Sequence, residues 1–486
     1  MSPATSSLPV AVIGAGPVGL AALARLIERG IPALVLEAGD AVGANLLDYG
    51  HVRLFSPWQY NVDHAMARLL EATGWRAPAP KGLPYAAEVV ERVLQPFAKL
   101  PQAAAAIRLS TRVTSIGREG FDKVRTRARE QAPFVIHAER EGQPVVFRAR
   151  AVIDASGTWG TPNPLGASGL PAAGEAQFAA RIFYGIPDVL GRDMRRYAGK
   201  RTLVVGAGHS AANSLLALAD LARDYPGTRL AWAVRSPVLT RVFGGGDADA
   251  LPARGQLGSQ LKALRDRGGL EFVSGLRITA LREDAAGSIT VSGLDLEGRT
   301  REIAGVDEII AATGQRPDLR ITSELRLRLD PMLESTEALA PLIDPNEHSC
   351  GTVRPHGHRE LSHPEPGFYT LGVKSYGRAP TFLMATGFEQ ARSVVAAIAG
   401  DIEAADRVEL ELPETGVCSV NLAPSGGAAA AGGCCGGPAK ADASACCALD
   451  EAKKAQGEAG CGCGTPAAPA AIAAKPAPAV ASSCCG

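Results

Sequence analysis

Two glycine-rich segments carry the residue pattern that binds the diphosphate of a dinucleotide. In the first, Gly14, Gly16 and Gly19 have the G-x-G-x-x-G spacing, Pro17 lies between the last two, and Glu37 follows about 20 residues later. The first glycine permits a tight turn, the second lets the backbone approach a diphosphate, and the third lets a helix pack closely on a strand. The carboxylate can accept hydrogen bonds from ribose hydroxyls. This segment therefore predicts a dinucleotide site.

The second segment, residues 206–211, repeats the pattern with alanine in place of the third glycine, which is an accepted variant. The strand after it ends in Arg235 instead of an acid. A carboxylate would repel the 2′-phosphate of NADP, whereas a guanidinium can neutralise it and bind it through two hydrogen bonds. The segment therefore predicts a site that prefers NADPH to NADH, and the alternative is that Arg235 is a solvated surface charge. The predicted NADPH-binding residues are Gly206, Gly208, His209, Ser210, Ala211 and Arg235.

Residues 348–363 hold four of the eight histidines together with Cys350. Imidazole and thiolate are ligands of zinc and copper. Prolines mark the segment as a loop, however, and loop histidines are commonly solvated or bonded to the backbone. Three alternatives stay open here: a metal site, solvated histidines, and a place beside the active site with Cys350 or His356 as a candidate catalytic residue.

The other nine of the ten cysteines lie between Cys418 and Cys485, in a segment rich in alanine and glycine. Their spacing is not that of a zinc finger, but adjacent thiolates suit soft ions such as trivalent arsenic, Hg(II) and Cu(I). The alternative is a low-complexity extension without a function. The candidate metal ligands are the paired cysteines Cys434, Cys435, Cys446, Cys447, Cys461, Cys463, Cys484 and Cys485.

The glycine segments need strands and helices to position them. Apolar runs over residues 9–13 and 33–36 predict two strands, with helical spacing of apolar residues between them. Residues 201–205 and 229–234 repeat this arrangement around the second segment. Short alternating runs between 107 and 151 predict a small antiparallel sheet, and residues 270–303 predict further short strands. A final helix is predicted to begin at a capping box formed by Thr386 and Glu389.

Composition narrows the class of protein. The 486 residues include 50 basic and 50 acidic side chains, so the formal net charge is zero and nothing points to a nucleic-acid or membrane partner. We expect no signal peptide, no transmembrane segment and a cytoplasmic location. The crowding of cysteines near one end argues against a disulfide-bonded secreted scaffold. Beyond Pro413, alanine, glycine, proline and serine dominate, which predicts disorder.

Two dinucleotide sites in one chain suggest hydride transfer between two cofactors. Over residues 8–400 the sequence resembles the two-dinucleotide-binding-domain flavoproteins, the superfamily of thioredoxin reductases and flavin-containing monooxygenases. The matching pieces are the two glycine segments, the turns at Asp154–Thr158 and Ala312–Gly314, and the segment from Tyr376 to Gly387. The resemblance implies FAD at the first site and NADPH at the second. The FAD-binding residues implied are Gly14, Gly16, Pro17, Gly19, Glu37, Thr313, Gly314, Thr386 and Gly387.

The resemblance implies an α/β fold with two Rossmann-like, three-layer ββα dinucleotide-binding domains, the NADPH domain being inserted in the FAD domain. Arg53, Ser56 and Trp58 become candidates for lining the flavin or substrate pocket, and Arg53 and Ser56 candidate catalytic residues, because the corresponding region of such proteins runs beneath the flavin. An ordinary buried turn is the alternative. The predicted divisions are 1–165 and 306–410 for the FAD domain, 166–305 for the NADPH domain, and 411–486 for a disordered Ala/Gly/Cys-rich tail.

The sequence also departs from the superfamily. Val373 stands where related proteins often carry an Asp that contacts the ribityl chain, the monooxygenase pattern F-x-G-x-x-x-H is not met, and the folded part has no C-x-x-C pair. The missing dithiol favours chemistry on the flavin itself, in which O₂ is used to oxygenate a soft nucleophile of a small-molecule substrate.

Three functions follow. The first is an FAD-dependent, NADPH-using, monooxygenase-like oxidoreductase, linked to metalloid detoxification because the body and tail are similar to proteins of arsenic and metal resistance operons. The second is an NADPH-dependent disulfide or metal-ion reductase that uses the tail cysteine pairs. The third is a metal-sequestering flavoprotein without turnover.

Overall fold

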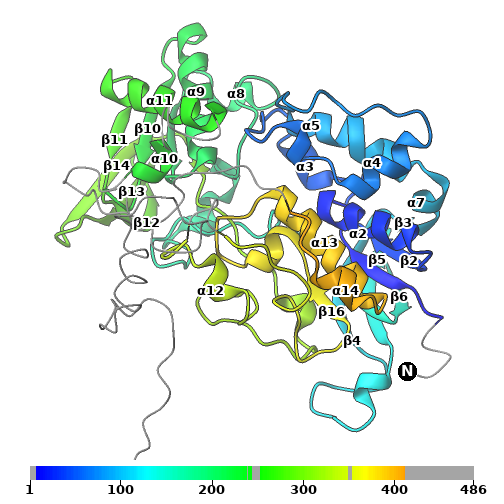
Figure 1. The fold of residues 1–486 in the computed structure, drawn as a ribbon. Helices are drawn as coiled ribbons and strands as arrows, with labels where there is room; N and C mark the ends of the chain where they lie inside the picture. Colours follow the sequence, from blue (N-terminus) through cyan, green and yellow to red (C-terminus); the bar gives the residue numbers. More distant parts are fainter. Residues whose placement is uncertain (1–6, 238, 244–251, 349–352, 411–486) are drawn as a thin grey trace, which may run out of the picture. The chain divides into compact units, whose positions relative to one another are not determined.

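The computed structural model describes residues 7–237, 239–243, 252–348 and 353–410 (Figure 1). Its first five-stranded sheet has the order β16-β7-β1-β2-β3, and every neighbouring pair is parallel. The strands are β1 (Val10–Ile13), β2 (Ala33–Leu36), β3 (Ile107–Arg108), β7 (Ala151–Asp154) and β16 (Phe368–Thr370).

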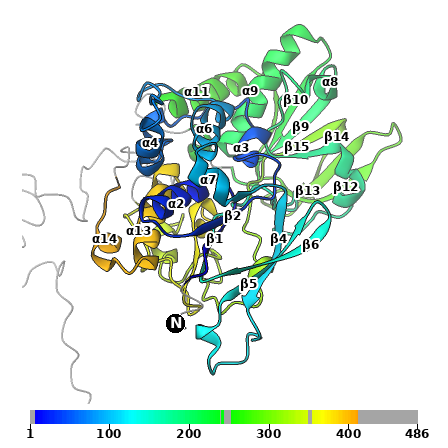
Figure 2. The ribbon, with the colours of Figure 1, turned by 90° about the vertical axis from the view of Figure 1, so that its right-hand side faces the viewer.

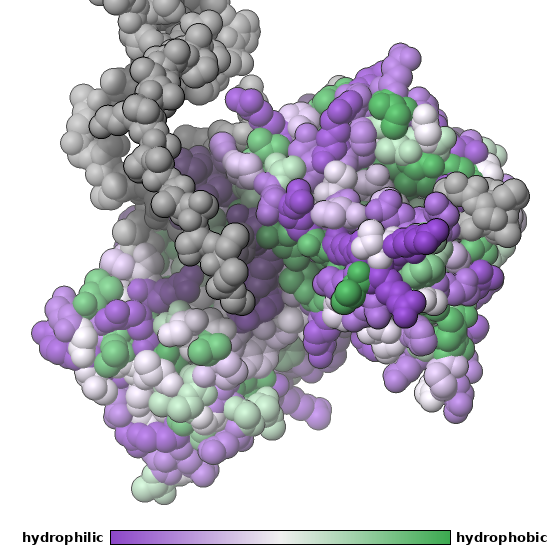
Figure 3. Space-filling model, turned by 90° about the horizontal axis from the view of Figure 1, so that it is seen from below, coloured by the Kyte–Doolittle hydropathy of each residue, from purple (hydrophilic) through white to green (hydrophobic). Residues whose placement is uncertain are grey.

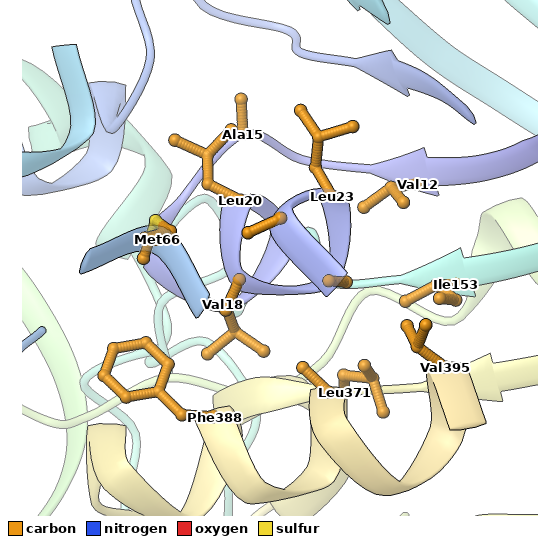
Figure 4. Close-up of a cluster of buried hydrophobic side chains, with 14 of the residues drawn as sticks. Val12, Ala15, Val18, Leu20, Leu23, Met66, Ile153, Leu371, Phe388 and Val395 are labelled. Atoms are coloured by element: carbon orange, nitrogen blue, oxygen red, sulfur yellow. The ribbon is translucent and has the colours of Figure 1, made fainter. Parts of the chain in front are cut away.

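Strand β1 is buried along its whole length because the first sheet is covered on both faces. One face packs against helices α2 (Pro17–Glu28) and α13 (Met384–Ile398), which contact each other (Figure 4). The other face packs against an antiparallel sheet, and Figure 2 shows this sheet and α2 on opposite sides of β1. The antiparallel strands are β4 (Thr111–Arg118), β5 (Phe134–Arg140) and β6 (Gln143–Ala149).

A second parallel sheet, of order β11-β10-β9-β15-β8, repeats this plan. Helices α9 (His209–Asp224) and α11 (Pro252–Asp266) cover one face, and an antiparallel sheet covers the other. The parallel strands are β8 (Ile182–Tyr184), β9 (Arg201–Val205), β10 (Arg229–Ala233), β11 (Glu271–Val273) and β15 (Glu308–Ala311). The antiparallel strands are β12 (Arg277–Glu283), β13 (Ile289–Leu294) and β14 (Thr300–Val306).

The predicted fold class is confirmed: each half is a three-layer ββα, Rossmann-like domain, and the second is inserted between β7 and β16 of the first. Strand β15 pairs with β8 and β9, so the second sheet continues past residue 305, where the sequence placed its end. The tail predicted for 411–486 lies outside the described residues. Among the described residues, no helix combines the length and apolar character needed to cross a bilayer.

Short helices fill the connections. In the first domain and its return they are α3 (Ala44–Asp48), η1 (Trp58–Tyr60), α4 (His64–Glu71), α5 (Ala86–Val89), η2 (Val90–Leu94), α6 (Gln95–Ala98), α7 (Pro101–Ala106), η3 (Arg129–Gln131), η6 (Arg320–Thr322), α12 (Ala340–Ile343), η7 (Gly372–Tyr376) and α14 (Ile402–Asp406). In the second they are η4 (Glu175–Arg181), α8 (Met194–Tyr197) and α10 (Thr240–Phe243). Hydrophilic and hydrophobic residues mix over the face in Figure 3.

A buried ion-pair group ties the first antiparallel sheet to the segment that enters β16. The Glu365 carboxylate lies 2.7 Å from Nε of Arg118 and 2.6 Å from Nη1 of Arg129, and none of the three side chains is more than 2% exposed. Burial alone would raise the pKa of Glu365, but hydrogen bonds from the Arg326 N–H and from both guanidinium groups outweigh it and lower the pKa. The carboxylate therefore remains charged in the core.

Replacing Glu365 with Gln should destabilise the protein strongly, because two guanidinium groups would be left in the core without their counter-charge. We expect Glu365→Gln to lower the free energy of unfolding by about 3–5 kcal/mol in urea denaturation. The matched control Glu302→Gln removes the charge from an exposed carboxylate that is bonded to Arg282 and Ser292, and it should leave the urea midpoint nearly unchanged.

The same variant gives a pH test. Because the folded-state pKa of Glu365 lies below its ordinary value of 4.5, its contribution to stability is present above that pH and is lost as the pH falls through the folded-state pKa. The wild-type protein should therefore lose stability more steeply below about pH 4.5 than Glu365→Gln. If the free energy of unfolding falls with pH equally steeply in the two proteins, the Glu365 carboxylate is not the group that causes the loss of stability in acid.

Candidate active site

A cleft of about 1520 Å³ runs along the carboxyl ends of both parallel sheets. The last residues of four strands line it, namely Ile13, Leu36, Val205 and Ala233. Open α/β sheets bind ligands at this edge, because the loops and helix N-termini that follow the strands face outward there. The cleft therefore brings both predicted dinucleotide segments to one site.

The three glycines of the first turn have different steric surroundings. Gly14 has φ +97°, and a Cβ there would lie 2.7 Å from the carbonyl oxygen of Ala155. A Cβ on Gly19 would lie 2.0 Å from the carbonyl oxygen of Gly14, so this glycine lets α2 pack on the turn. A Cβ on Gly16 would meet no protein atom within 4 Å, and Gly16 and Pro17 line the cleft. Position 16 is thus free of protein contact and open to a ligand.

The second turn repeats this pattern. Gly206 has φ +133°, and a Cβ there would lie 2.2 Å from the carbonyl oxygen of Ala312, whereas a Cβ on Gly208 would have open space around it. His209 and Ser210 line the cleft after it. Ala211, in the place of the third glycine, is fully buried in the α9 core. The structure therefore places every residue of the second predicted segment in or directly behind the cleft.

Three helices of twelve or more residues begin at the cleft without a side-chain cap. The N-cap residues of α2, α9 and α13 are Gly16, Gly208 and Leu383, all of which line the cleft, and none of these helices has an acidic residue in its first turn. Helices α4 and α14 instead have the carboxylates of Asp63 and Asp401 as caps. Uncapped N–H groups and the positive end of the helix dipole favour an anion. The residues present therefore fit dinucleotide diphosphates.

The two residues that distinguish the sites lie at the cleft as well. Glu37 accepts hydrogen bonds from the backbone N–H of Ala15 at 2.6 Å and of Gly39 at 2.7 Å, which fixes its carboxylate against the first turn. A carboxylate has about four lone-pair positions, so capacity for ribose hydroxyls is left. Arg235 is exposed at the cleft after β10, beside Ser236.

Thr313 and Gly314 also line the cleft, where the two connections between the domains meet. The hydroxyl of Thr313 donates a hydrogen bond to the carbonyl oxygen of Asn163 at 2.5 Å. The backbone N–H of Asn163 donates to the carbonyl oxygen of Gly314 at 2.9 Å. Gly314 has φ +83°, a conformation that favours glycine. These bonds brace the two connections against each other beside the cleft.

The helix α13 begins earlier than the sequence indicated. Its first residue is Met384, and Thr386 lies inside the first turn, 3% exposed. The predicted capping box is wrong, because Glu389 is bonded to Arg392 at 2.7 Å instead. Gly387 packs against Val18 of α2 and does not line the cleft. Leu383 and Met384 line it in place of Thr386 and Gly387, whose role toward FAD stays a prediction.

Among the candidate catalytic residues, Arg53 and Ser56 line the cleft, but His356 does not. His356 is 4% exposed; its Nδ1 lies 3.0 Å from the carbonyl oxygen of Arg354, and its Nε2 accepts from Nε2 of Gln390 at 3.0 Å. Burial lowers the pKa of His356, which keeps the ring neutral. It supports the floor of the cleft from behind.

The remaining histidines of this segment have separate partners. His348 contacts the carbonyl oxygen of Pro341, and His358 contacts the Asp406 carboxylate. The ring of His363 packs near Phe368, and burial lowers its pKa to about 4. Among the described residues, no three His, Cys, Asp or Glu side chains come together as a metal site. Cys350 and the eight paired cysteines of the tail lie outside the described residues.

Several residues that the sequence did not single out also meet at the cleft, one of them against the predicted His209. The rings of Tyr49 and Trp159 lie 4.6 Å apart, and Trp159 donates to the Asp48 carboxylate at 2.9 Å. The ring of Phe55 lies 5.2 Å from that of His209, so the two domains touch beside the second glycine turn. These pairs join residues more than 100 positions apart, and their sequence carries only an unspecific signal, aromatic residues beside glycines.

Fold and site together define a two-domain protein with two dinucleotide half-sites on one cleft. The chain belongs to the pyridine nucleotide-disulphide oxidoreductase family, whose model matches residues 11–351. It is therefore an oxidoreductase. No curated protein matches the sequence significantly.

Solved structures share the fold. A bacillithiol disulfide reductase from Bacillus cereus is 19% identical, with 81% of this chain and 99% of that chain covered and a TM-score of 0.57. An FAD-bound cadaverine monooxygenase from Erwinia amylovora is 13% identical, with 86% of this chain and 99% of that chain covered and a TM-score of 0.58. A flavin monooxygenase mutant from Stenotrophomonas maltophilia is 22% identical, with 81% of this chain and 98% of that chain covered and a TM-score of 0.52. Reductases and monooxygenases thus both have this fold.

The glycine geometry predicts two kinds of variant. Gly14→Ala and Gly206→Ala should destabilise the fold by about 1–3 kcal/mol each, because both combine positive φ with a backbone clash. Gly16→Ala and Gly208→Ala should unfold close to the wild-type temperature, because their Cβ atoms meet no protein atom. Thermal unfolding of the ligand-free proteins measures this, and equal losses for all four variants would contradict the steric assignment.

Proposed function

We propose that the chain is a cytoplasmic oxidoreductase that binds FAD at the first glycine turn and NADPH at the second, and that hydride passes from the nicotinamide to the flavin. The observation that carries the proposal is that two uncapped, glycine-lined helix N-termini, at Gly16 and Gly208, open on one cleft. The fold shared with an FAD-bound monooxygenase and with an ornithine N-hydroxylase solved with reduced FAD and NADP⁺ supports it.

In the FAD half, the N–H groups at the start of α2 bind the diphosphate, and Glu37 accepts hydrogen bonds from the adenosine ribose. When bound, FAD supplies the centre that accepts hydride. The start of α13 at Leu383 directs the positive end of that helix into the cleft and favours negative charge there. Gly14 and Thr313 hold the backbone around the cofactor.

In the NADPH half, the start of α9 at Gly208 binds the second diphosphate, and Arg235 pairs with the 2′-phosphate. Phe55 and His209 contact each other between the halves and exclude water where nicotinamide and flavin meet. The aromatic pair Tyr49 and Trp159, with Arg53 and Ser56, completes the wall available to a substrate.

The reaction proposed first is oxygenation of a small molecule with O₂. All ten cysteines lie outside the described residues, and the described lining of the cleft mixes aromatic and aliphatic side chains with polar and charged ones. The aromatic and aliphatic part of this lining would help to protect reactive reduced flavin from water. A soft nucleophile such as trivalent arsenic, sulfur or nitrogen is the proposed substrate class, and the tail cysteine pairs supply thiophilic ligands for a metalloid.

The second candidate is an NADPH-dependent reductase that passes electrons from flavin to tail disulfides or to a bound metal ion. The family description and the fold shared with a bacillithiol disulfide reductase favour it. The third candidate is a flavoprotein whose tail sequesters metal without turnover. The eight paired cysteines between Cys434 and Cys485 are the observation behind both alternatives.

Replacing all nine tail cysteines with serine in the full chain separates these functions. The purified wild-type protein should be yellow, release FAD on denaturation and oxidise NADPH with uptake of O₂. If oxygenation is the function, the cysteine-free tail should leave NADPH oxidation within about twofold of wild type, because the flavin reacts directly. Loss of oxidation in this variant would favour the reductase. A colourless protein that takes up no FAD would refute the whole proposal.

Arg235→Ala should raise the KM for NADPH by about 10- to 100-fold and leave the KM for NADH unchanged, because charge-assisted hydrogen bonds contribute about 1.5–3 kcal/mol. Steady-state kinetics with NADPH and with NADH measure the ratio of the two KM values. Arg223→Ala, which removes the same charge from an exposed site outside the cleft lining, is the control and should change neither value. Equal changes for both nucleotides would show that Arg235 does not recognise the 2′-phosphate.

A further inference from the structure

A buried ion pair lies at the floor of the FAD half of the cleft. Nζ of Lys374 is 2.7 Å from Oδ2 of Asp154, with the two side chains 2% and 0% exposed. The ammonium group also donates to Oγ of Ser156 at 3.0 Å, and that hydroxyl donates to Oδ1 of Asp154 at 2.7 Å. The pair joins the end of β7 to the turn η7, which follows β16.

Only one charged member of the pair lines the cleft. Lys374 and Ser156 line it, whereas Asp154 does not. Asp154 lines a separate cavity of about 10 Å³, together with Lys374 and His363. Lys374 is therefore the charged residue of the pair that a ligand in the cleft can approach.

Lys374 is held firmly in this place. Gly372, with φ +71°, donates its N–H to Oε1 of Gln390 at 2.8 Å, and Nε2 of Gln390 donates to Oγ of Ser375 at 2.9 Å. The imidazole of His356 fixes Gln390 from behind at 3.0 Å. Residues on both sides of Lys374 are thus anchored to α13, and the ammonium group cannot move out with the turn.

The contact between β16 and β7 does not depend on the ion pair between Lys374 and Asp154. Strands β16 and β7 are already hydrogen-bonded up to Thr370 and Asp154. Burying two charges is costly, and an apolar pair of similar size is often as stabilising or more so. A buried cation beside a cleft is explained if the ligand is an anion, because an unscreened charge acts strongly at low dielectric.

We propose that Lys374 is a positioning residue that supplies positive charge to the FAD half of the cleft, strengthening FAD binding and favouring the reduced flavin. This inference rests on the proposed function. A dinucleotide brings the negative charge of its diphosphate into the cleft, and hydride transfer to the flavin adds another negative charge. The neighbouring residue Val373 also lines the cleft and carries no charge.

The test compares four full-length variants: Lys374→Met, Lys374→Arg, the double variant Lys374→Met with Asp154→Asn, and Arg25→Met. The last breaks another buried ion pair, with Asp63 at 2.9 Å, which does not line the cleft. For each variant we measure the thermal midpoint, the Kd for FAD from flavin fluorescence, and the reduction potential of bound flavin against a redox dye.

Lys374→Met should weaken FAD binding at least tenfold and make the flavin potential more negative. Lys374→Arg should keep both within about threefold of wild type, since the charge is retained. The double variant removes both charges, so its thermal midpoint should recover while its FAD affinity and potential stay altered. Arg25→Met should lower only the thermal midpoint.

Recovery of all three properties in the double variant would overturn the inference, because the pair would then be purely structural. Failure of both Lys374→Met and the double variant to fold, while Arg25→Met folds, would overturn it in the same way. A wild-type protein without flavin refutes the proposed function itself, whereas yellow variants with unchanged affinity and potential refute only the role of Lys374.

Discussion

The structure depends on one steric constraint: the closest approach between each glycine turn and the chain that leaves the neighbouring strand. Gly14 lies against Ala155 after β7, and Gly206 lies against Ala312 after β15, with no room for a Cβ at either place. Both contacted residues begin a connection between the two domains. The same close contacts therefore hold the dinucleotide turns, the domain connections and the cleft in one arrangement, and the uncapped starts of α2 and α9 face that cleft as a result.

Buried charge is used in two different ways. Glu365 lies between Arg118 and Arg129, away from the cleft, and joins the antiparallel sheet to the chain that enters β16. Asp154 and Lys374 form a pair of similar burial, but one member lines the cleft. Helix termini follow the same division, because carboxylate caps occur on α4 and α14 and are absent from the three long helices, α2, α9 and α13, that begin at the cleft. Negative charge is thus kept out of the helix starts, where an anionic ligand needs the free N–H groups.

Membership of the pyridine nucleotide-disulphide oxidoreductase family establishes redox chemistry, and the shared fold extends to reductases and monooxygenases alike. The difference between those reactions lies in what meets the nicotinamide and the flavin at the cleft. In the described part of this chain, the cleft lining combines aromatic and aliphatic side chains with amide, hydroxyl and charged ones.

The sequence by itself determined the ββα class, the two glycine turns and the acid and arginine that follow them, because these depend on local sterics and on residues within one strand–turn–helix–strand unit. Tertiary structure decided the rest. The start of α13 at Met384 depends on packing against α2, and no side chain in that segment marks it. His356 is removed from the cleft by its bond to Gln390, and Lys374 meets Asp154 from 220 residues away. Such contacts form only when distant strands pair, so the spacing of residues along the chain cannot reveal them.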